Sequence, residues 1–336
     1  MPIISRRALL AGATVLAAPA ILRWPAEAAE FAYKCGSVLP SDHPMIIRFT
    51  EAAQKIKADT GGQFEIAIYP SSALGQDSAM VSQVISGALQ MYTLSGDLIG
   101  SRVPAAGITS VGFIFPDYGK VWPAMDGELG EHIRTLAEKV GLYSVPKTFD
   151  HGFRNVTTKS KPINSVDDLQ GMKLRVPVAP TSISLFQHLG ASPTPINFGE
   201  VYSALQTGVV DGQENPLILI DVAKLFEVQR YVSMTNHTWA GYNVAFNMGA
   251  WKKLPAKVQD ITAQRVAEAA VLERADWLKL NETVVEHLKA SGMVFNTPAP
   301  ESFRTRLKTS GYYADMQKRM GPEAWALLEK YGGPLA

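Results

Sequence analysis

The sequence predicts an α/β fold in two lobes, and three observations support this prediction. Residues 31–70 read as a strand, a helix and a second strand, which is a succession typical of parallel sheets. The segments "QVISGALQM" (83–91) and "SALQTGVVDG" (203–212) both read as a helix end, a glycine and a short apolar strand, as two similar lobes would show. From Pro255 to Ser291 the chain has no glycine and no further proline, which predicts one long helix.

The first elements follow from the spacing of apolar residues. A strand is expected over 31–38, and a helix is expected to begin near Pro44, because proline suits the first helical turn. The pair Gly61-Gly62 predicts the end of this helix. One face of the helix is apolar, through Ile46, Phe49, Ala53 and Ile56. In "QFEIAIYP" (63–70) apolar residues recur at every second position, which predicts a strand.

The two lobes are expected to be discontinuous in sequence. The segments 153–163 and 235–243 mark the predicted boundaries. Lobe I is expected to contain residues 31–151 and 241–280, and lobe II residues 152–240 and 281–336. A helix over 255–291 extends on the order of 50 Å at 1.5 Å per residue. Because this is longer than one small lobe, the helix is expected to lie across both.

The N-terminus has the features of an export signal over residues 1–28. Ser5-Arg6-Arg7 precedes an uncharged stretch over 8–22, and Ala-Glu-Ala follows at 26–28. The paired arginines favour the twin-arginine route, although a Sec signal can carry them too. The apolar stretch is too short to span a bilayer comfortably, so the mature chain is not expected to insert into a membrane. Loss of three arginines and one glutamate changes the net charge from +1 to −1.

Composition narrows the classes of function. The net charge is +1 and no long run of like charges occurs, which argues against nucleic acid or an anionic membrane surface as the main partner. The single cysteine, Cys35, excludes an internal disulfide and a cysteine-based metal cluster, and it is expected to be a small buried hydrophobe. Motifs for a serine nucleophile, a zinc pair or a nucleotide loop do not occur. Neither catalysis nor a cofactor or metal is expected.

The segment "GMKLRVP" (171–177) predicts a short strand with a permanent cation near its end. With the strand period of two, Lys173 and Arg175 share one face. One interpretation is a solvated face of an edge strand. The other places Arg175 at the carboxyl end of a parallel strand, where ligands of open α/β sheets bind. There the guanidinium could hold a carboxylate through two parallel hydrogen bonds.

Three more residues are candidates for the same crevice, each with a simpler alternative. Asn215 precedes Pro216 and "LILI", so it is either the N-cap of the next helix or a polar group at a second strand end. Phe198 is either a core residue or a wall of the crevice. Arg154 lies in the first boundary segment, where a surface position is the default.

Several segments resemble the solute-binding proteins of tripartite ATP-independent periplasmic (TRAP) transporters, the dicarboxylate- and sialic-acid-binding family. The segments are "LPSDHP", "YPSSALGQDSAMVSQVISGAL", "FRNVTTKSKPINSVDDLQGMKLRVP", "GASPTPINFGEVYSALQTGVVDGQENP" and "MTNH", in the expected order. The resemblance covers most of the mature chain. It implies a periplasmic-binding-protein-like fold (type II-like), in which two lobes close over one organic anion and a long helix spans both.

The resemblance also implies roles for individual residues. The carboxylate-binding arginine of the family is similar to Arg175, and its second arginine to Arg154. The ligand-facing asparagine and aromatic are similar to Asn215 and Phe198. The other residues that the resemblance implies at the cleft are Trp239, His43, Gln76 and Ser95. The sialic-acid branch carries a glutamate near the position of Ser95, and this departure argues against a sialic acid.

The function that the resemblance implies is periplasmic capture of a small carboxylate and its delivery to a TRAP membrane permease. The expected partners are this ligand and the permease subunits, and a monomer is the usual state of the family. Two alternatives remain open from the sequence: a ligand-sensing protein for a signalling receptor, and an exported enzyme on the same scaffold.

Overall fold

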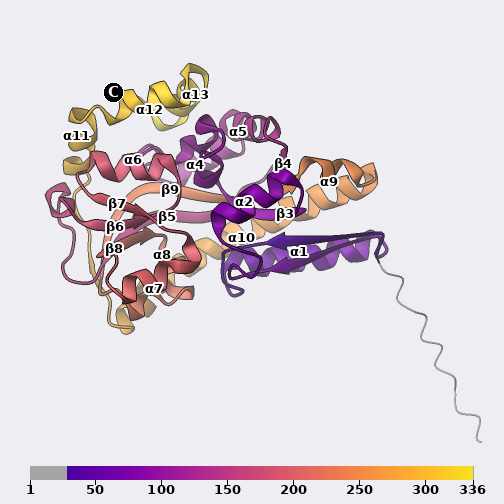
Figure 1. Cartoon of the computed structure of the whole chain (residues 1–336), viewed down its shortest axis with the longest axis horizontal. Coiled ribbons are helices and arrows are strands. Elements are labelled where there is room, and N and C mark those ends of the chain that lie inside the picture. The colour runs from indigo at the N-terminus through magenta and orange to yellow at the C-terminus, as the bar shows by residue number, and fades with distance from the viewer. Residues whose placement is uncertain (1–28, 336) are drawn as a thin grey trace, which may run out of the picture.

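A mixed β-sheet with helices on both faces forms the centre of the molecule (Figure 1). The computed structural model describes residues 29–335, and within them the sheet has ten strands. The strands are β1 (Phe31–Gly36), β2 (Phe64–Tyr69), β3 (Met91–Ser95), β4 (Leu142–Ser144), β5 (Phe149–Thr158), β6 (Lys173–Val176), β7 (Ser192–Pro195), β8 (Gly212–Asn215), β9 (Tyr231–Asn247) and β10 (Val294–Asn296).

The strand order is β2-β1-β3-β9-β5-β8-β6-β7, with β4 and β10 paired to β9. At one end β1 is parallel to β2 and β3. At the other end β6 is parallel to β7 and β8. Between them, β9 is antiparallel to both β3 and β5. Two parallel α/β units, the two lobes of the fold, are therefore joined through the long central strands β5 and β9.

Thirteen α-helices and four short 3₁₀ turns connect the strands within residues 29–335. The α-helices are α1 (Pro44–Asp59), α2 (Asp77–Ser86), α3 (Gly96–Ile99), α4 (Tyr118–Met125), α5 (Glu128–Glu138), α6 (Pro180–His188), α7 (Val201–Gln206), α8 (Leu217–Val222), α9 (Met248–Lys253), α10 (Ala256–Ala290), α11 (Glu301–Thr309), α12 (Tyr312–Met320) and α13 (Pro322–Gly332). The 3₁₀ turns are η1 (Pro104–Ser110), η2 (Val166–Leu169), η3 (Phe198–Glu200) and η4 (Leu225–Glu227).

Helix α10 confirms the prediction of one long helix across both lobes. It has 35 residues, which corresponds to about 52 Å at 1.5 Å per residue. Val258 and Val266, near its start, belong to the hydrophobic core that α1 and β1 share. Trp277 and Leu288, further along, belong to a separate core with α7 and α8. One helix thus contributes to a core on each side of the molecule.

The predicted strand–helix–strand unit at the start of the chain is confirmed. β1 and β2 pair in parallel with Phe31 opposite Phe64, and Pro44 opens α1. Cys35 is fully buried in the core beneath α1, as expected of a small hydrophobe. The predicted boundary segments lie mainly in β5 and β9, while the lobe boundaries themselves stay a prediction.

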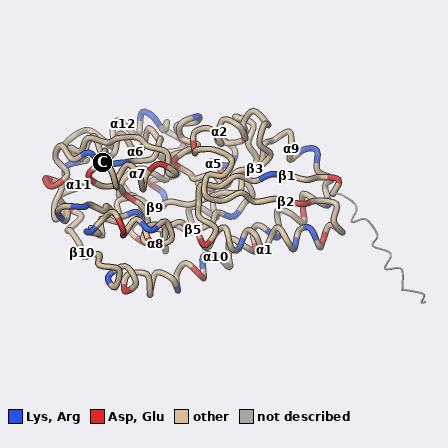
Figure 2. The backbone as a smooth tube through the Cα atoms, turned by 60° about the horizontal axis from the view of Figure 1, so that its bottom comes forward, with Lys and Arg blue, Asp and Glu red and all other residues tan. Residues whose placement is uncertain are grey.

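Charged residues are interspersed along the described backbone (Figure 2). Basic and acidic positions are interspersed along both α1 and α10, and neither helix carries charges of one sign only. Across residues 29–335, every helix is too short or too polar to cross a bilayer. The predicted export signal, residues 1–28, lies outside the described residues.

A bulge in β5 fits the central strands against α10. The register of β5 against β9 shifts between Asp150 and Gly152, and Gly152 has a φ of +93°. A Cβ at this position would lie 2.8 Å from the ring of Trp277 on α10. The close approach of strand and helix therefore requires glycine here, both for its backbone angle and for its lack of a side chain.

Replacing Gly152 with alanine is expected to destabilise the protein more than the same change at Gly292. Both glycines have a φ of +93°, but a Cβ at Gly292 meets nothing within 4 Å. The backbone strain costs about 1–2 kcal/mol at either position, and overpacking against Trp277 adds about 1–3 kcal/mol at Gly152 alone. Urea unfolding of the two variants measures the difference. Equal losses of unfolding free energy would show that the bulge tolerates a side chain.

Candidate functional site

Arg175 is buried near the carboxyl end of β6. This strand lies between β8 and β7, and the residue is only 2% exposed. The interpretation as a solvated face of an edge strand is therefore wrong. The Arg175 Nε donates a hydrogen bond of 2.9 Å to the carbonyl oxygen of Ile196. Among the residues that the structure describes, no carboxylate lies within ion-pair distance of its guanidinium, so the cation has no acidic side-chain partner.

A small cavity lies against Arg175, where strand ends from both halves of the sheet meet. Ser95 ends β3 and Asn215 ends β8, and both line the cavity together with Arg154 and Phe198. Five of the eight residues proposed from the sequence are thus brought together. Ser95, Arg175 and Asn215 lie at or near the carboxyl ends of strands that have parallel neighbours, whereas Arg154 lies within β5, whose neighbours β8 and β9 are antiparallel. The space between these walls is about 20 Å³, close to the volume needed for one water molecule.

Arg154, unlike Arg175, has an internal partner. Its guanidinium forms an ion pair with Glu214 on β8, and Arg154 Nη2 lies 2.8 Å from Glu214 Oε1. His237 on β9 lies with its Nε2 at 3.0 Å from the other oxygen of the same carboxylate. Both Arg154 and Glu214 are buried, so the default surface position for Arg154 is wrong. Glu214 neutralises this charge within the fold.

The electrostatic environment separates the two arginines further. Burial raises the pKa of Glu214, but the charge of Arg154 and the hydrogen bonds from His237 and Arg154 outweigh it and lower that pKa to about 2. Burial lowers the pKa of the Arg175 guanidinium to about 10, against the opposing charges of Glu214 and Asp77. Arg175 thus remains a cation at neutral pH, in surroundings that disfavour an uncompensated charge.

Asn215 is positioned by its neighbours and does not cap a helix. Its Oδ1 accepts a hydrogen bond of 3.0 Å from Arg154 Nη2, and its Nδ2 donates to the side-chain oxygen of Gln213. The residue at the N-cap of α8 is Pro216, without a side-chain cap bond. The N-cap interpretation of Asn215 is therefore wrong, and its amide is a fixed part of the cavity wall.

Phe198 serves both as packing and as a wall of the cavity. Its ring packs against the buried cores on all sides of the site. The guanidinium carbon of Arg175 lies 5.9 Å from the ring centroid, within the range of a cation–π contact. The backbone N–H of Phe198 donates a hydrogen bond of 2.6 Å to Asp77 at the start of α2. This bond joins the two halves of the sheet across the cavity.

The other three proposed residues do not line this cavity. The indole N–H of Trp239 donates to Asp150 at 2.9 Å within the core. His43 is the N-cap of α1, where its Nδ1 accepts from the N–H of Met45. Gln76 is the residue before α2 and lies beside Gly199. A ligand contact for any of these three stays a prediction.

Sequence reasoning missed several residues of the cavity wall. The polar ones are Asp77, Asp97 and Tyr242, and the apolar ones are Leu98, Pro177 and Leu219. Asp97 could have been found, because it follows the end of β3 by two residues. This strand is parallel to β1, and the rule that singled out Arg175 applies there too. Asp77 adjoins Gln76 in sequence. Tyr242 faces Ser95 across β3 and β9, a pairing that only the sheet order reveals.

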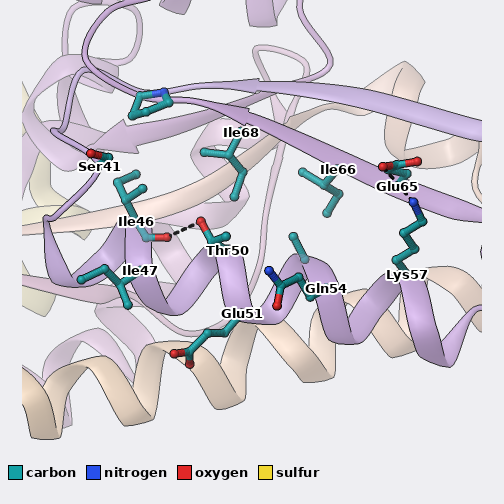
Figure 3. A pocket seen from close by; sticks show the side chains of 12 residues that line it. Ser41, Ile46, Ile47, Thr50, Glu51, Gln54, Lys57, Glu65, Ile66 and Ile68 are labelled. Carbon is teal, nitrogen blue, oxygen red and sulfur yellow. Dashed lines mark hydrogen bonds and ion pairs between the residues drawn. The ribbon is translucent and has the colours of Figure 1, made fainter.

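A larger groove lies elsewhere, between α1 and β2 (Figure 3). Its volume is about 610 Å³ and most of its walls are aliphatic, with Ile66 and Ile68 pointing from β2 toward α1. Its charged groups are paired at the surface, with 2.9 Å between Lys57 Nζ and Glu65 Oε1. The groove therefore offers no uncompensated buried charge to attract a ligand, and the cavity at Arg175 is the candidate site.

The family model described as bacterial extracellular solute-binding protein, family 7, matches residues 35–319. The C4-dicarboxylate-binding periplasmic protein DctP of Rhodobacter capsulatus is 30% identical, over 97% of this chain and 98% of its own length. Uncharacterized protein y4mM of Sinorhizobium fredii is 33% identical over 80% of this chain, and the match spans only 50% of its length.

Solved structures with the same fold contain organic acids. A TRAP periplasmic solute-binding protein from Polaromonas bound to D-erythronate has a TM-score of 0.85 and 28% identity, covering 90% of this chain and 99% of its own. A TRAP periplasmic solute-binding protein from Sulfurospirillum deleyianum with bound succinate has a TM-score of 0.84, with the same identity and coverage. These matches show that the two-lobed fold predicted from the sequence is correct.

Replacing Glu214 with glutamine is expected to destabilise the protein by about 3–5 kcal/mol at neutral pH, because Arg154 is left buried without a counterion. The folded-state pKa of about 2 is below the unfolded value of about 4.3. The carboxylate's contribution is therefore complete above the unfolded pKa and is lost as the pH falls toward the folded pKa. The difference in unfolding free energy between wild type and variant should narrow over that interval.

Urea unfolding at stepwise pH measures this difference. Exposed Glu282, on α10, supplies the control, since Glu282→Gln is expected to change stability by less than about 0.5 kcal/mol. A difference for Glu214→Gln that stays constant down to the folded pKa would contradict an ionised Glu214 in the folded protein.

Proposed function

Because the chain belongs to the bacterial extracellular solute-binding proteins of family 7, we propose that it binds a small organic acid through the acid's carboxylate and delivers it to a TRAP membrane permease. The observation that carries this proposal is the state of Arg175. It is a buried cation in a cavity wall, and no acidic side chain among the described residues pairs with it. A carboxylate is the ligand group that matches a planar guanidinium through two parallel bonds.

The other groups of the proposed binding site hold Arg175 in place. The bond from Nε to Ile196 fixes the plane of the guanidinium and leaves its two terminal nitrogens available. Phe198 lies over the guanidinium at 5.9 Å. Arg154 and Asn215 hold each other at 3.0 Å beside it. A ligand carboxylate then meets donors that need little reorganisation, which favours tight binding.

Binding requires the two halves of the sheet to separate and close again. A pocket for a small ligand commonly has a volume of roughly 300–1,000 Å³, whereas the walls here leave about 20 Å³. The bond between the Phe198 N–H and Asp77 joins walls from opposite halves. We assign this arrangement to the closed form, whose shape identifies a loaded protein to the permease.

The cellular setting belongs to the same proposal. The relative from Rhodobacter capsulatus is named a periplasmic binding protein, and the N-terminal sequence has the features of an export signal. We therefore place the mature chain in the periplasm, as a monomer that binds its ligand without turnover. The match to a family of solute-binding proteins favours this function over a signalling partner or an exported enzyme.

Replacing Arg175 with alanine is expected to weaken carboxylate binding by about 2–5 kcal/mol, since the carboxylate is then enclosed without a countercharge. Arg175→Lys is also expected to weaken binding, because a point charge cannot form the two parallel bonds of a guanidinium. Isothermal titration calorimetry measures both variants, with an acid first identified by a thermal-shift screen. An acid present at a hundred times its dissociation constant stabilises the wild type by about 2.7 kcal/mol.

Lys173 provides a matched control because it is an exposed cation on the same strand. Lys173→Ala should bind the acid as the wild type does. If Arg175→Ala binds within about twofold of wild type, a change below 0.5 kcal/mol, the carboxylate is held elsewhere and the proposed site is wrong. The amide of the same acid should produce no thermal shift.

A further inference from the structure

The candidate cavity has walls of opposite charge. On one side, Arg154 and Arg175 project from β5 and β6. On the other side, Asp77 at the start of α2 and Asp97 in α3 line the same small space. Both aspartates are buried, at 5% and 8% exposure. A ligand whose carboxylate meets Arg175 therefore faces acidic groups at its other end.

The two aspartates differ in what they can offer to a ligand. Asp77 uses both oxygens within the protein: Oδ2 accepts from the N–H of Phe198 at 2.6 Å, and Oδ1 lies 3.4 Å from the hydroxyl of Tyr92. Asp97 accepts one hydrogen bond, from the hydroxyl of Ser95 to Oδ1. Its Oδ2 has no hydrogen-bond donor among the described residues. Asp97 is thus the acidic side chain with a free acceptor in the cavity wall.

The charges of Arg154 and Arg175 do not balance those of Asp77 and Asp97, because Arg154 is already paired. Glu214 already neutralises Arg154, so Arg175 is the one arginine of this cavity wall whose charge remains for a ligand. A ligand with a second carboxylate would place it toward Asp97, as two like charges in a site of low dielectric. A ligand with a hydrogen-bond donor there would instead satisfy the free Oδ2 of Asp97.

We infer that the ligand is a hydroxylated monocarboxylate, with its carboxylate on Arg175 and a hydroxyl on Asp97, and that Asp97 selects against dicarboxylates. This inference rests on the proposed function and specifies the substrate class of the same site. It separates two acids that similar proteins contain, since D-erythronate has one carboxylate and succinate has two.

A hydroxyl fits this wall better than an ammonium or a methyl group does. Asp97 supplies an acceptor, while the cation of Arg154 and the hydroxyl of Tyr242 in the same wall can donate. A hydroxyl both donates and accepts, so it satisfies both kinds of group. An ammonium would donate to Asp97 but cannot accept from Arg154 or Tyr242, and a methyl group would leave Asp97 Oδ2 without a partner.

Four-carbon acids of equal length test the inference on the mature protein by isothermal titration calorimetry. The probes are D-erythronate, succinate, butanoate and 4-aminobutanoate, which differ mainly in the groups away from one carboxylate. D-erythronate is expected to bind at least about tenfold more tightly than each of the others. Equal or tighter binding of succinate, butanoate or 4-aminobutanoate overturns the substrate class but leaves carboxylate binding intact. If none of the four acids binds and the thermal-shift screen identifies no other acid, the proposed function is wrong; if the screen identifies an acid without hydroxyl groups, only the substrate class is wrong.

The variant Asp97→Asn tests the role of the residue through a gain of binding. Removal of the negative charge is expected to strengthen succinate binding by about tenfold and to weaken D-erythronate binding. A residue with only a structural role would weaken both acids. Exposed Asp260 on α10 supplies the control, since Asp260→Asn should leave both affinities unchanged. If Asp97→Asn weakens succinate as much as D-erythronate, Asp97 does not select between them.

Discussion

The ion pair between Arg154 and Glu214 is the interaction on which the candidate site depends. Burial lowers the pKa of Arg175, and repulsion by the guanidinium of Arg154 in the same small cavity lowers it further. Glu214 accepts two bonds from Arg154 and a third contact from His237. The charge of Arg154 is therefore neutralised within the fold, whereas the charge of Arg175 is left for a ligand to neutralise.

Under the proposed function, this division makes closure of the two halves depend on the ligand. Burying a charge without a partner is unfavourable, so a closed form with Arg175 uncompensated is disfavoured relative to an open form in which water solvates the side chain. A bound carboxylate removes this penalty. The closed shape then reports that an anion is present, which is what a binding protein must signal to a transport partner.

The sequence predicted those parts of the fold that depend on local patterns. Hydrophobic spacing and the glycine pair located α1, and the absence of glycine and proline located α10. The strand containing Arg175 followed from alternation and a terminal proline. Whether Arg175 met solvent was not decidable from that segment, because the answer depends on β7 and β8, which cover both edges of β6. A ligand role for Arg154 was suggested only by the resemblance to a family, because no local pattern in the sequence indicates it.

Contacts between distant segments could not be predicted in the same way. Glu214 is 60 residues from Arg154, and Asp77 is 121 residues from its partner Phe198. His43 and Trp239 were proposed as ligand contacts, but the Nδ1 of His43 is used in a helix cap and the indole N–H of Trp239 in a core hydrogen bond. A polar residue near the end of a strand or helix can either contact a ligand or hydrogen-bond within the fold. Only the three-dimensional arrangement shows which partner it has.

The residue proposed to anchor the acid and the residue proposed to select among acids lie in different walls of the cavity. Arg175 belongs to the half of the sheet that contains β6 and β8, whereas Asp97 follows β3 in the other half. An acid can therefore bind Arg175 while the halves are apart, before its far end meets Asp97. Closure brings the second wall into contact and adds attraction for a hydroxyl or repulsion for a carboxylate. Under the proposed function, selectivity is then expressed in the closing step, because an acid of the wrong class would occupy Arg175 without stabilising the closed shape.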